Sequence, residues 1–276
     1  MQKKSLEVCC YVAGAGAFGV FLRWLQDQLA FNELHLADKS VFHVLVVLFV
    51  AAAAYVFLRF IDRAQKEYLY VPESFTEAFR AEGRLYRLLR RVIGGLMVVG
   101  ALVLFFTCET DKMAGMLRFL AILALLAGVA FPMLLAEANR EDQKPGLLCV
   151  LSFLPVLTFA VWLVSSYRAN SINSVPWSYV LEIATASMGM VSFFRLAGFA
   201  FGNPKGWRCW FDAMFGALLC LMSLADERYM GMQIILFAAA AMQILYTWII
   251  VKNLKQGKAP EKRPEKHYDD GFEHLR

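Results

Sequence analysis

Charged residues are scarce in this 276-residue chain. They make up 18% of it, and hydrophobic residues make up 59%, against about 25% and about 45–50% in soluble proteins. The charges also cluster and leave long uncharged stretches between them. This composition excludes a disordered protein, a disulfide scaffold and an ordinary soluble enzyme, and it predicts an integral membrane protein with several spans.

Motifs for catalysis and metal binding are missing as well. The chain has no HExxH, no G-x-S-x-G, no Walker A loop and no G-x-G-x-x-G before a predicted helix. Its six cysteines form no CxxC pair, and its four histidines are widely spread. We therefore predict no catalytic residue, no cofactor and no metal site. The net charge of +5 gathers at the ends of apolar stretches, which predicts no nucleic-acid partner.

Long apolar stretches are what the chain does contain. A helix needs about 20 mostly apolar residues to cross about 30 Å of hydrocarbon. The length of the apolar stretches favours helices over barrel strands, which are about ten residues long and strictly alternate apolar and polar residues. We predict an all-α polytopic integral membrane helical bundle over 1–251, in which 207–225 is the weakest span. Eight stretches qualify: 8–25, 40–60, 92–107, 114–136, 146–167, 177–201, 207–225 and 229–251.

The basic residues predict the orientation of this bundle. With the N-terminus inside, 21 Lys and Arg fall on the cytoplasmic side and 5 on the outer side. Loops rich in Lys and Arg stay in the cytoplasm. We therefore predict an integral protein of a bacterial cytoplasmic membrane with both termini in the cytoplasm.

The segment 72–91, between the second and third predicted spans, carries a basic surface. Its arginines stand beside apolar residues at helical spacing, which predicts an amphipathic helix that lies on the cytoplasmic face and runs into the third span. The surface is either a plain positive-inside anchor or a site for anionic lipid headgroups or a cytosolic partner. We predict that the tail, 252–276, is disordered. The arginines are Arg80, Arg84, Arg87, Arg90 and Arg91.

Apart from Arg23, Arg59 and Arg208 at span ends, four charged residues lie inside the predicted spans, where each costs about 2.5–3.5 kcal/mol. They are Arg118, Glu182, Arg195 and Asp212, with His43 as a weaker fifth. At 1.5 Å per residue, their depths predict an Arg118–Glu182 pair near the outer face and an Arg195–Asp212 pair near the inner face. Each pair would remove the penalty of an uncompensated charge. His43 lies near the level of the outer pair.

Small and polar residues share one face with these charges. Thr185, Gly189 and Ser192 lie between Glu182 and Arg195 on one side of the sixth predicted span. Two interpretations stay open. The charges join helices as structural pairs, or they line a polar path with Glu182 and Asp212 as ion or proton sites.

Two parts of the first hundred residues resemble a group of uncharacterised multi-pass membrane proteins of Gram-positive anaerobic bacteria. One is the glycine-rich run from Gly16 to Gln26 with Ala30-Phe31 after it, and the other is Ser74-Phe75, Glu77-Ala78-Phe79 and Gly83-Arg84-Leu85-Tyr86. The chain departs from the group at Leu34-His35-Leu36, where Thr-Gly-Leu is usual. The resemblance implies a bacterial plasma membrane and no particular activity.

These features support three hypotheses. The first is a transporter-like or channel-like component for a small solute or ion, which the polar face suggests. The second is a non-catalytic membrane scaffold or sensor that recruits a cytosolic partner through the basic surface. The third is a membrane enzyme that acts on lipid, which the missing catalytic motifs disfavour.

Overall fold

The computed structural model describes residues 2–30, 40–108, 113–140, 144–171 and 176–257. Within these ranges, eight helices are long and apolar enough to cross a membrane. They include Gly206–Ala225, the weakest of the predicted spans, so the all-α polytopic bundle is confirmed. The long helices are α1 (Gln2–Ala30), α2 (Ser40–Lys66), α4 (Arg84–Thr107), α5 (Ala114–Glu137), α6 (Pro145–Asn170), α7 (Pro176–Ala200), α8 (Gly206–Met222) and α9 (Met230–Lys252).

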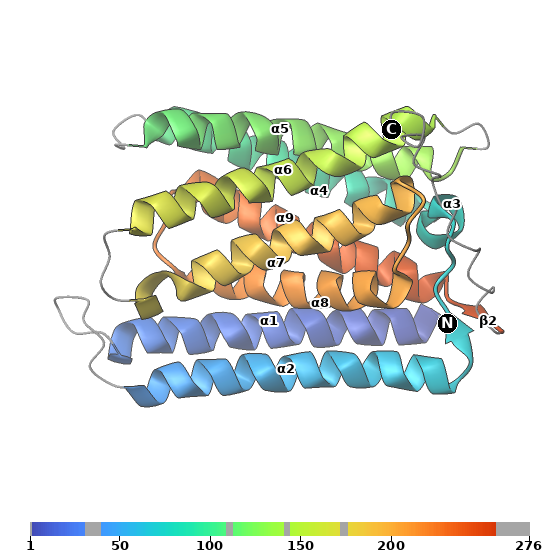
Figure 1. Cartoon of the computed structure of the whole chain (residues 1–276), viewed down its shortest axis with the longest axis horizontal. Helices are drawn as coiled ribbons and strands as arrows, with labels where there is room; N and C mark the ends of the chain where they lie inside the picture. Colours follow the sequence, from blue (N-terminus) through green and yellow to red (C-terminus); the bar gives the residue numbers. More distant parts are fainter. Residues whose placement is uncertain (1, 31–39, 109–112, 141–143, 172–175, 258–276) are drawn as a thin grey trace, which may run out of the picture.

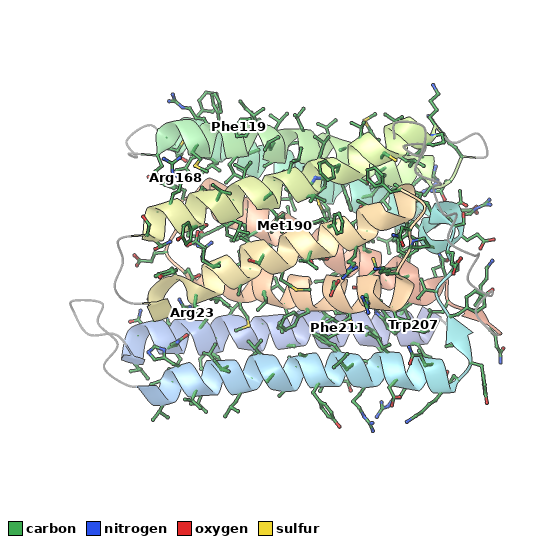
Figure 2. All side chains as sticks on the ribbon, in the orientation of Figure 1. Arg23, Phe119, Arg168, Met190, Trp207 and Phe211 are labelled. Atoms are coloured by element: carbon green, nitrogen blue, oxygen red, sulfur yellow. The ribbon has the colours of Figure 1, made fainter. Side chains whose placement is uncertain are left out.

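The helices run side by side along the long axis of the molecule (Figure 1). We name the two ends of the bundle after the acidic residues near them, the Asp226 end and the Asp212 end. Figure 2 shows Arg23 near the Asp226 end and Trp207 at the opposite one. Helix α1 begins and α9 finishes at the Asp212 end, as an even number of spans requires. The charge count assigns that end to the cytoplasm, which stays a prediction.

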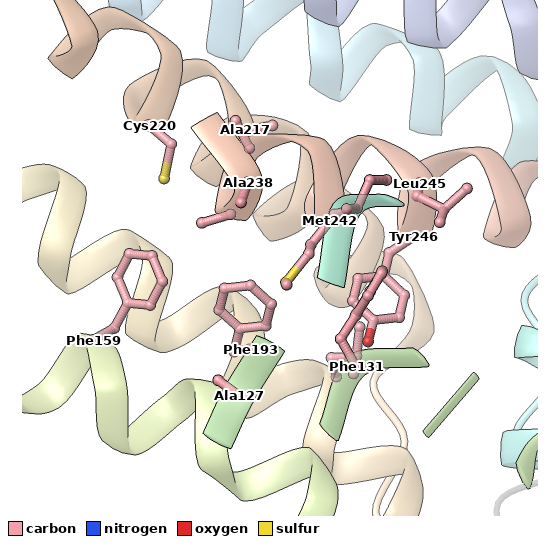
Figure 3. Packing of buried hydrophobic residues seen from close by; sticks show 14 of the residues in the cluster. Ala127, Phe131, Phe159, Phe193, Ala217, Cys220, Ala238, Met242, Leu245 and Tyr246 are labelled. Carbon is pink, nitrogen blue, oxygen red and sulfur yellow. The ribbon is translucent and has the colours of Figure 1, made fainter. Parts of the chain in front are cut away.

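Helix α9 lies in the middle of the bundle, where it packs against α4, α8 and α1. It is also the most buried of the eight candidate spans. Buried rings and small side chains fill the space around it. Figure 3 shows the Phe131 ring beside Tyr246 of α9, and the Phe159 ring beside Phe193. At the other extreme, α2 lies at the edge of the bundle, beyond α1 (Figure 1).

The segment 72–91 differs from its prediction, because it is not one helix lying on the surface. It contains the five-residue helix α3 (Phe75–Phe79), a turn, and then the first residues of α4, which already belong to the third long helix. The turn ends at Gly83, whose positive φ of 128° suits glycine. The apolar side of α3 points into the protein instead of a lipid surface, since Phe75, Ala78 and Phe79 are buried.

Helix α3 is fixed by contacts from three distant parts of the chain. The Phe79 ring meets the Phe199 ring at 5.1 Å and the Tyr246 ring at 5.6 Å, both edge-on. The Asn253 amide donates to the carbonyl oxygens of Ala78 and Arg80 at 2.9 and 2.8 Å. Strand β1 (Leu69–Tyr70) pairs with β2 (Lys255–Gln256) beside it. We call the segment 69–81 the α3 cap, because these contacts hold it over the Asp212 end of the core.

Glycines allow α4 to approach its neighbours closely. A Cβ atom at Gly94 would lie 2.6 Å from the backbone oxygen of Gly128 on α5. A Cβ atom at Gly231 of α9 would lie 2.2 Å from the backbone nitrogen of Leu104 on α4. Small residues at such crossings are typical of membrane helices, whose association depends on close van der Waals packing.

Gly94→Ala is expected to lower the free energy of unfolding by about 1–3 kcal/mol, since its methyl group must push α4 away from α5. Gly95→Ala is the matched control, because a Cβ there meets nothing within 4 Å. Denaturant unfolding of the purified protein in one detergent measures both variants. Equal stability of the two would contradict the close α4–α5 contact.

Candidate functional site

Asp226 joins two arginines at one end of the bundle. It follows the short 3-10 helix η1 (Ser223–Ala225), which turns the chain after α8. Its Oδ1 accepts from Nε of Arg23 at 2.7 Å, and its Oδ2 accepts from Nη2 of Arg228 at 2.7 Å. The Ser223 hydroxyl also donates to Oδ2 at 3.2 Å. The Arg23 side chain is only 4% exposed, so its charge is compensated inside the protein.

The same network reaches α2 through α1. Nη1 of Arg23 donates to Oε1 of Gln26 at 2.7 Å. The amide nitrogen of Gln26 in turn contacts Nδ1 of His43 on α2. All three side chains are buried. His43 was the weakest of the five candidate residues inside the spans. It lies in the same network as Glu182, one of the two candidates on α7.

Glu182 lies at the other end of this network. Its Oε1 accepts from Nε1 of Trp162 at 3.2 Å and from the Ser166 hydroxyl at 2.5 Å. Its Oε2 lies 3.7 Å from Nη2 of Arg228. The guanidinium of Arg228 also covers the Trp162 ring, 5.5 Å from its centre. The charges thus alternate from Arg23 through Asp226 and Arg228 to Glu182. We call these residues the Asp226 cluster: Arg23, Gln26, His43, Trp162, Ser166, Glu182, Asp226 and Arg228.

The predicted Arg118–Glu182 pair is wrong, because Arg228 is the cation that contacts Glu182. Arg118 lies on α5, whose main neighbours are α4 and α6. Its guanidinium lies over the Phe105 ring of α4, 5.7 Å from the ring centre. Helix α6 separates α5 from the helix that carries Glu182 (Figure 1). The prediction compared only the depths of Arg118 and Glu182 along their helices. Depth does not show whether two helices are neighbours.

The predicted Arg195–Asp212 pair is confirmed. Nε of Arg195 on α7 lies 3.4 Å from Oδ2 of Asp212 on α8. The side chains are 26% and 12% exposed, so the pair is partly shielded at its end of the bundle. Because α7 and α8 are consecutive antiparallel helices in contact, residues at equal depth on their facing sides meet.

A cavity of about 620 Å³ opens beside Glu182. We call it the Glu182 cavity. Its polar groups come from Trp162, Ser165, Ser166, Glu182, Glu227 and Arg228, and the remaining wall is mostly apolar. Ligand cavities typically measure about 300–1,000 Å³ and combine apolar walls with a few polar groups. The apolar and small lining residues are Leu104, Met113, Leu117, Ala169, Tyr229 and Met232.

The polar face of α7 continues from Glu182 toward the Asp212 end through Thr185 and Gly189, but these residues do not line an open path. Thr185 is fully buried, and its hydroxyl donates to the carbonyl oxygen of Leu181 at 2.7 Å. A Cβ at Gly189 would lie 2.2 Å from the Phe159 ring. The Phe159 ring therefore occupies the space beside Gly189. This face serves helix packing in the structure.

The candidate arginine surface is divided between two environments. Arg80 follows α3 and pairs with Glu82 at 3.1 Å. The other four lie on the first two turns of α4, where Arg84, Arg87 and Arg91 are exposed and Arg90 covers the Tyr86 ring at 5.6 Å. The apolar residues beside them, such as Leu85 at 67% exposed, are open to the surroundings rather than buried in the protein.

Within the described ranges, no three His, Cys, Asp or Glu side chains come together as a metal site would require. Comparison of the chain with protein-family models, with curated proteins and with solved structures gives no match. The function is therefore inferred from the geometry of the chain's own residues.

Proposed function

We propose that the chain is a transporter-like protein of a bacterial cytoplasmic membrane, and that it binds a small zwitterionic solute in the Glu182 cavity. One observation carries the proposal. Glu182 and Arg228 present opposite charges on one cavity wall, with Oε2 and Nη2 3.7 Å apart. Hydrogen bonds between such groups are about 2.7–2.9 Å long, so the contact leaves both groups with unused hydrogen-bonding capacity.

A zwitterion matches this arrangement better than an ion of either sign. Nη2 of Arg228 also pairs with Asp226 at 2.7 Å, but its buried Nη1 has no hydrogen-bond partner among the described residues. A solute carboxylate can accept from Nη1 while the solute's ammonium group donates to Glu182, so the zwitterion adds no net charge beside Asp226. A solute with one charge would oppose one of the two residues. The apolar wall, which includes Leu104, Leu117 and Met232, favours a solute with an apolar body.

The binding experiment uses leucine, 3-methylbutylamine and 4-methylpentanoate, which share an apolar body and differ in their charged groups. Purified protein in lipid nanodiscs is expected to bind leucine more tightly than the other two. Glu182→Gln is expected to weaken leucine binding by about tenfold, equivalent to about 1.4 kcal/mol, because the ammonium group loses its carboxylate. Isothermal titration calorimetry measures the affinities, and uptake into proteoliposomes tests transport.

Glu73→Gln is the control variant, because Glu73 is exposed near α3 and lies outside the cavity. It should bind leucine as the wild type does. Equal affinity for all three compounds, or a Glu182→Gln variant with unchanged leucine binding, would contradict the proposed site.

The exposed arginines of α4 support a second role, as a binding surface for anionic lipid headgroups. Arg84, Arg87 and Arg91 lie beside lipid-exposed leucines at the end of a candidate span. Changing all three to Gln should weaken phosphatidylglycerol binding by about 1 kcal/mol per residue, as measured by lipid titration in detergent. Arg80→Gln is the control because Arg80 pairs with Glu82. Unchanged binding by the triple variant would contradict this role and leave a partner protein as the alternative.

A further inference from the structure

A second cavity, of about 370 Å³, lies between α2 and α7 with α1 and α8 behind it. We call it the α2–α7 slot. Its polar groups are concentrated toward the Asp226 end, where Arg23, Gln26 and His43 line it, and Ser187 lies further down. The other lining residues are apolar: Val46, Val47, Val50, Val180, Leu181, Ala184, Met188, Val191, Phe215 and Leu219.

The slot is long in the direction of the helices. On α7 it extends from Val180 to Val191, which is about 16 Å at 1.5 Å per residue. On α2 it extends from His43 to Val50, which is about 10 Å by the same measure. The hydrocarbon core of a bilayer is about 30 Å thick. The slot therefore reaches from the headgroup level to about the middle of the membrane, which is the depth of one leaflet.

The slot is open sideways to the bilayer. Val47 on one rim is 50% exposed and Val180 on the other is 44% exposed. Leu219 on the floor is only 3% exposed. A lipid chain can therefore enter the slot sideways, between Val47 and Val180, and reach Leu219 of α8 on its floor.

We propose that the α2–α7 slot binds one acyl chain of a membrane phospholipid, with the ester end of the chain toward Gln26 and His43. The slot holds about 370 Å³. That is too little for a helix of another protein, since a helix about 10 Å wide fills roughly 1,250 Å³ over a length of about 16 Å. Arg23 already pairs with Asp226, so the carboxylate of a free fatty acid would place an additional negative charge beside Asp226. A phospholipid keeps its phosphate further out in the headgroup layer and avoids this cost.

The test uses phosphatidylcholine vesicles that contain the full-length protein and a trace of phosphatidylcholine with a diazirine on one acyl chain. After irradiation, mass spectrometry of peptides locates the labelled residues. Label is expected on residues 215–219 of α8. Ala184→Phe and Ser187→Phe each fill the slot and should remove the α8 label. Val44→Phe is the control. Val44 lies one helical turn before Val47 on α2, is exposed to the lipid, and does not line the slot.

A second measurement uses the wild-type protein alone and compares two positions of the diazirine along the acyl chain. A diazirine near the end of the chain should label Phe215 more than Leu219, and one near the ester should label Leu219 more than Phe215, because Leu219 lies nearer the Asp226 end. The absence of α8 label, equal labelling from both positions, or label only from a diazirine fatty acid would each overturn the proposal. The experiment does not involve the Glu182 cavity, so its outcome is independent of solute binding.

Discussion

Asp226→Asn is expected to lower the free energy of unfolding by about 3–5 kcal/mol. The Asp226 carboxylate contacts Arg23 and Arg228 at once. Their side chains are only 4% and 10% exposed, so water does not replace the lost carboxylate effectively. An amide of the same shape keeps the packing but cannot compensate the two positive charges. Denaturant unfolding in a single detergent gives the difference from the wild type.

Glu227→Gln is the matched control, because Glu227 is the next residue and is exposed. Its effect should stay within about 0.5 kcal/mol. The double variant Arg23→Gln with Asp226→Asn should lose less stability than the sum of the single variants, since it removes both members of one pair. A strictly additive result, or an Asp226→Asn variant as stable as Glu227→Gln, would show that the pair does not stabilise the fold.

Phe79→Ala is expected to cost about 3–5 kcal/mol. The Phe79 side chain is fully buried and meets the rings of Phe75, Phe199 and Tyr246. Removing it leaves a void where the α3 cap meets α7 and α9. Besides the loss of global stability, hydrogen exchange should accelerate in residues 69–81, because the cap depends on this contact to stay in place.

Phe119→Ala is the control for this experiment. Phe119 is 52% exposed on the outer side of α5 (Figure 2), so its removal creates no internal void. Its effect should stay within about 0.5 kcal/mol, with unchanged exchange in residues 69–81. If Phe79→Ala leaves that exchange unchanged, the cap is held by its backbone and amide contacts alone.

The sequence alone predicted the spans and one ion pair, because both depend on local information. Apolar length identifies each helix without knowledge of its neighbours. Arg195 and Asp212 lie on consecutive helices, so depth was enough to bring them together. Helices α1, α2 and α4 are longer than their predicted spans of 8–25, 40–60 and 92–107, because a helix continues past the apolar stretch that defines it. The tail was predicted to be disordered from 252, but Lys252 still belongs to α9 and Lys255–Gln256 form β2. From 258 onward the predicted tail lies outside the described residues.

The Asp226 cluster was missed because it depends on which helices are neighbours. Arg23 and Asp226 are 203 residues apart in the chain. Arg23 lies at the end of the predicted first span and Arg228 in a loop, so both were counted among surface charges. A signal was present in the spacing of Arg23 and Gln26, three residues apart on one helix face. Depth alone also placed Arg118 beside Glu182, although α6 lies between their helices.

The position of α9 has a consequence for the way the protein is made. Helix α9 follows the other seven candidate spans in the chain, yet it occupies the centre of the bundle. A ribosome delivers helices in chain order, and they associate after insertion. The first seven spans therefore enter the membrane before the helix that completes their core. Until α9 arrives, the face of α4 around Gly100 lacks the close contact with Gly231 and Ile235 of α9 that covers it in the finished bundle.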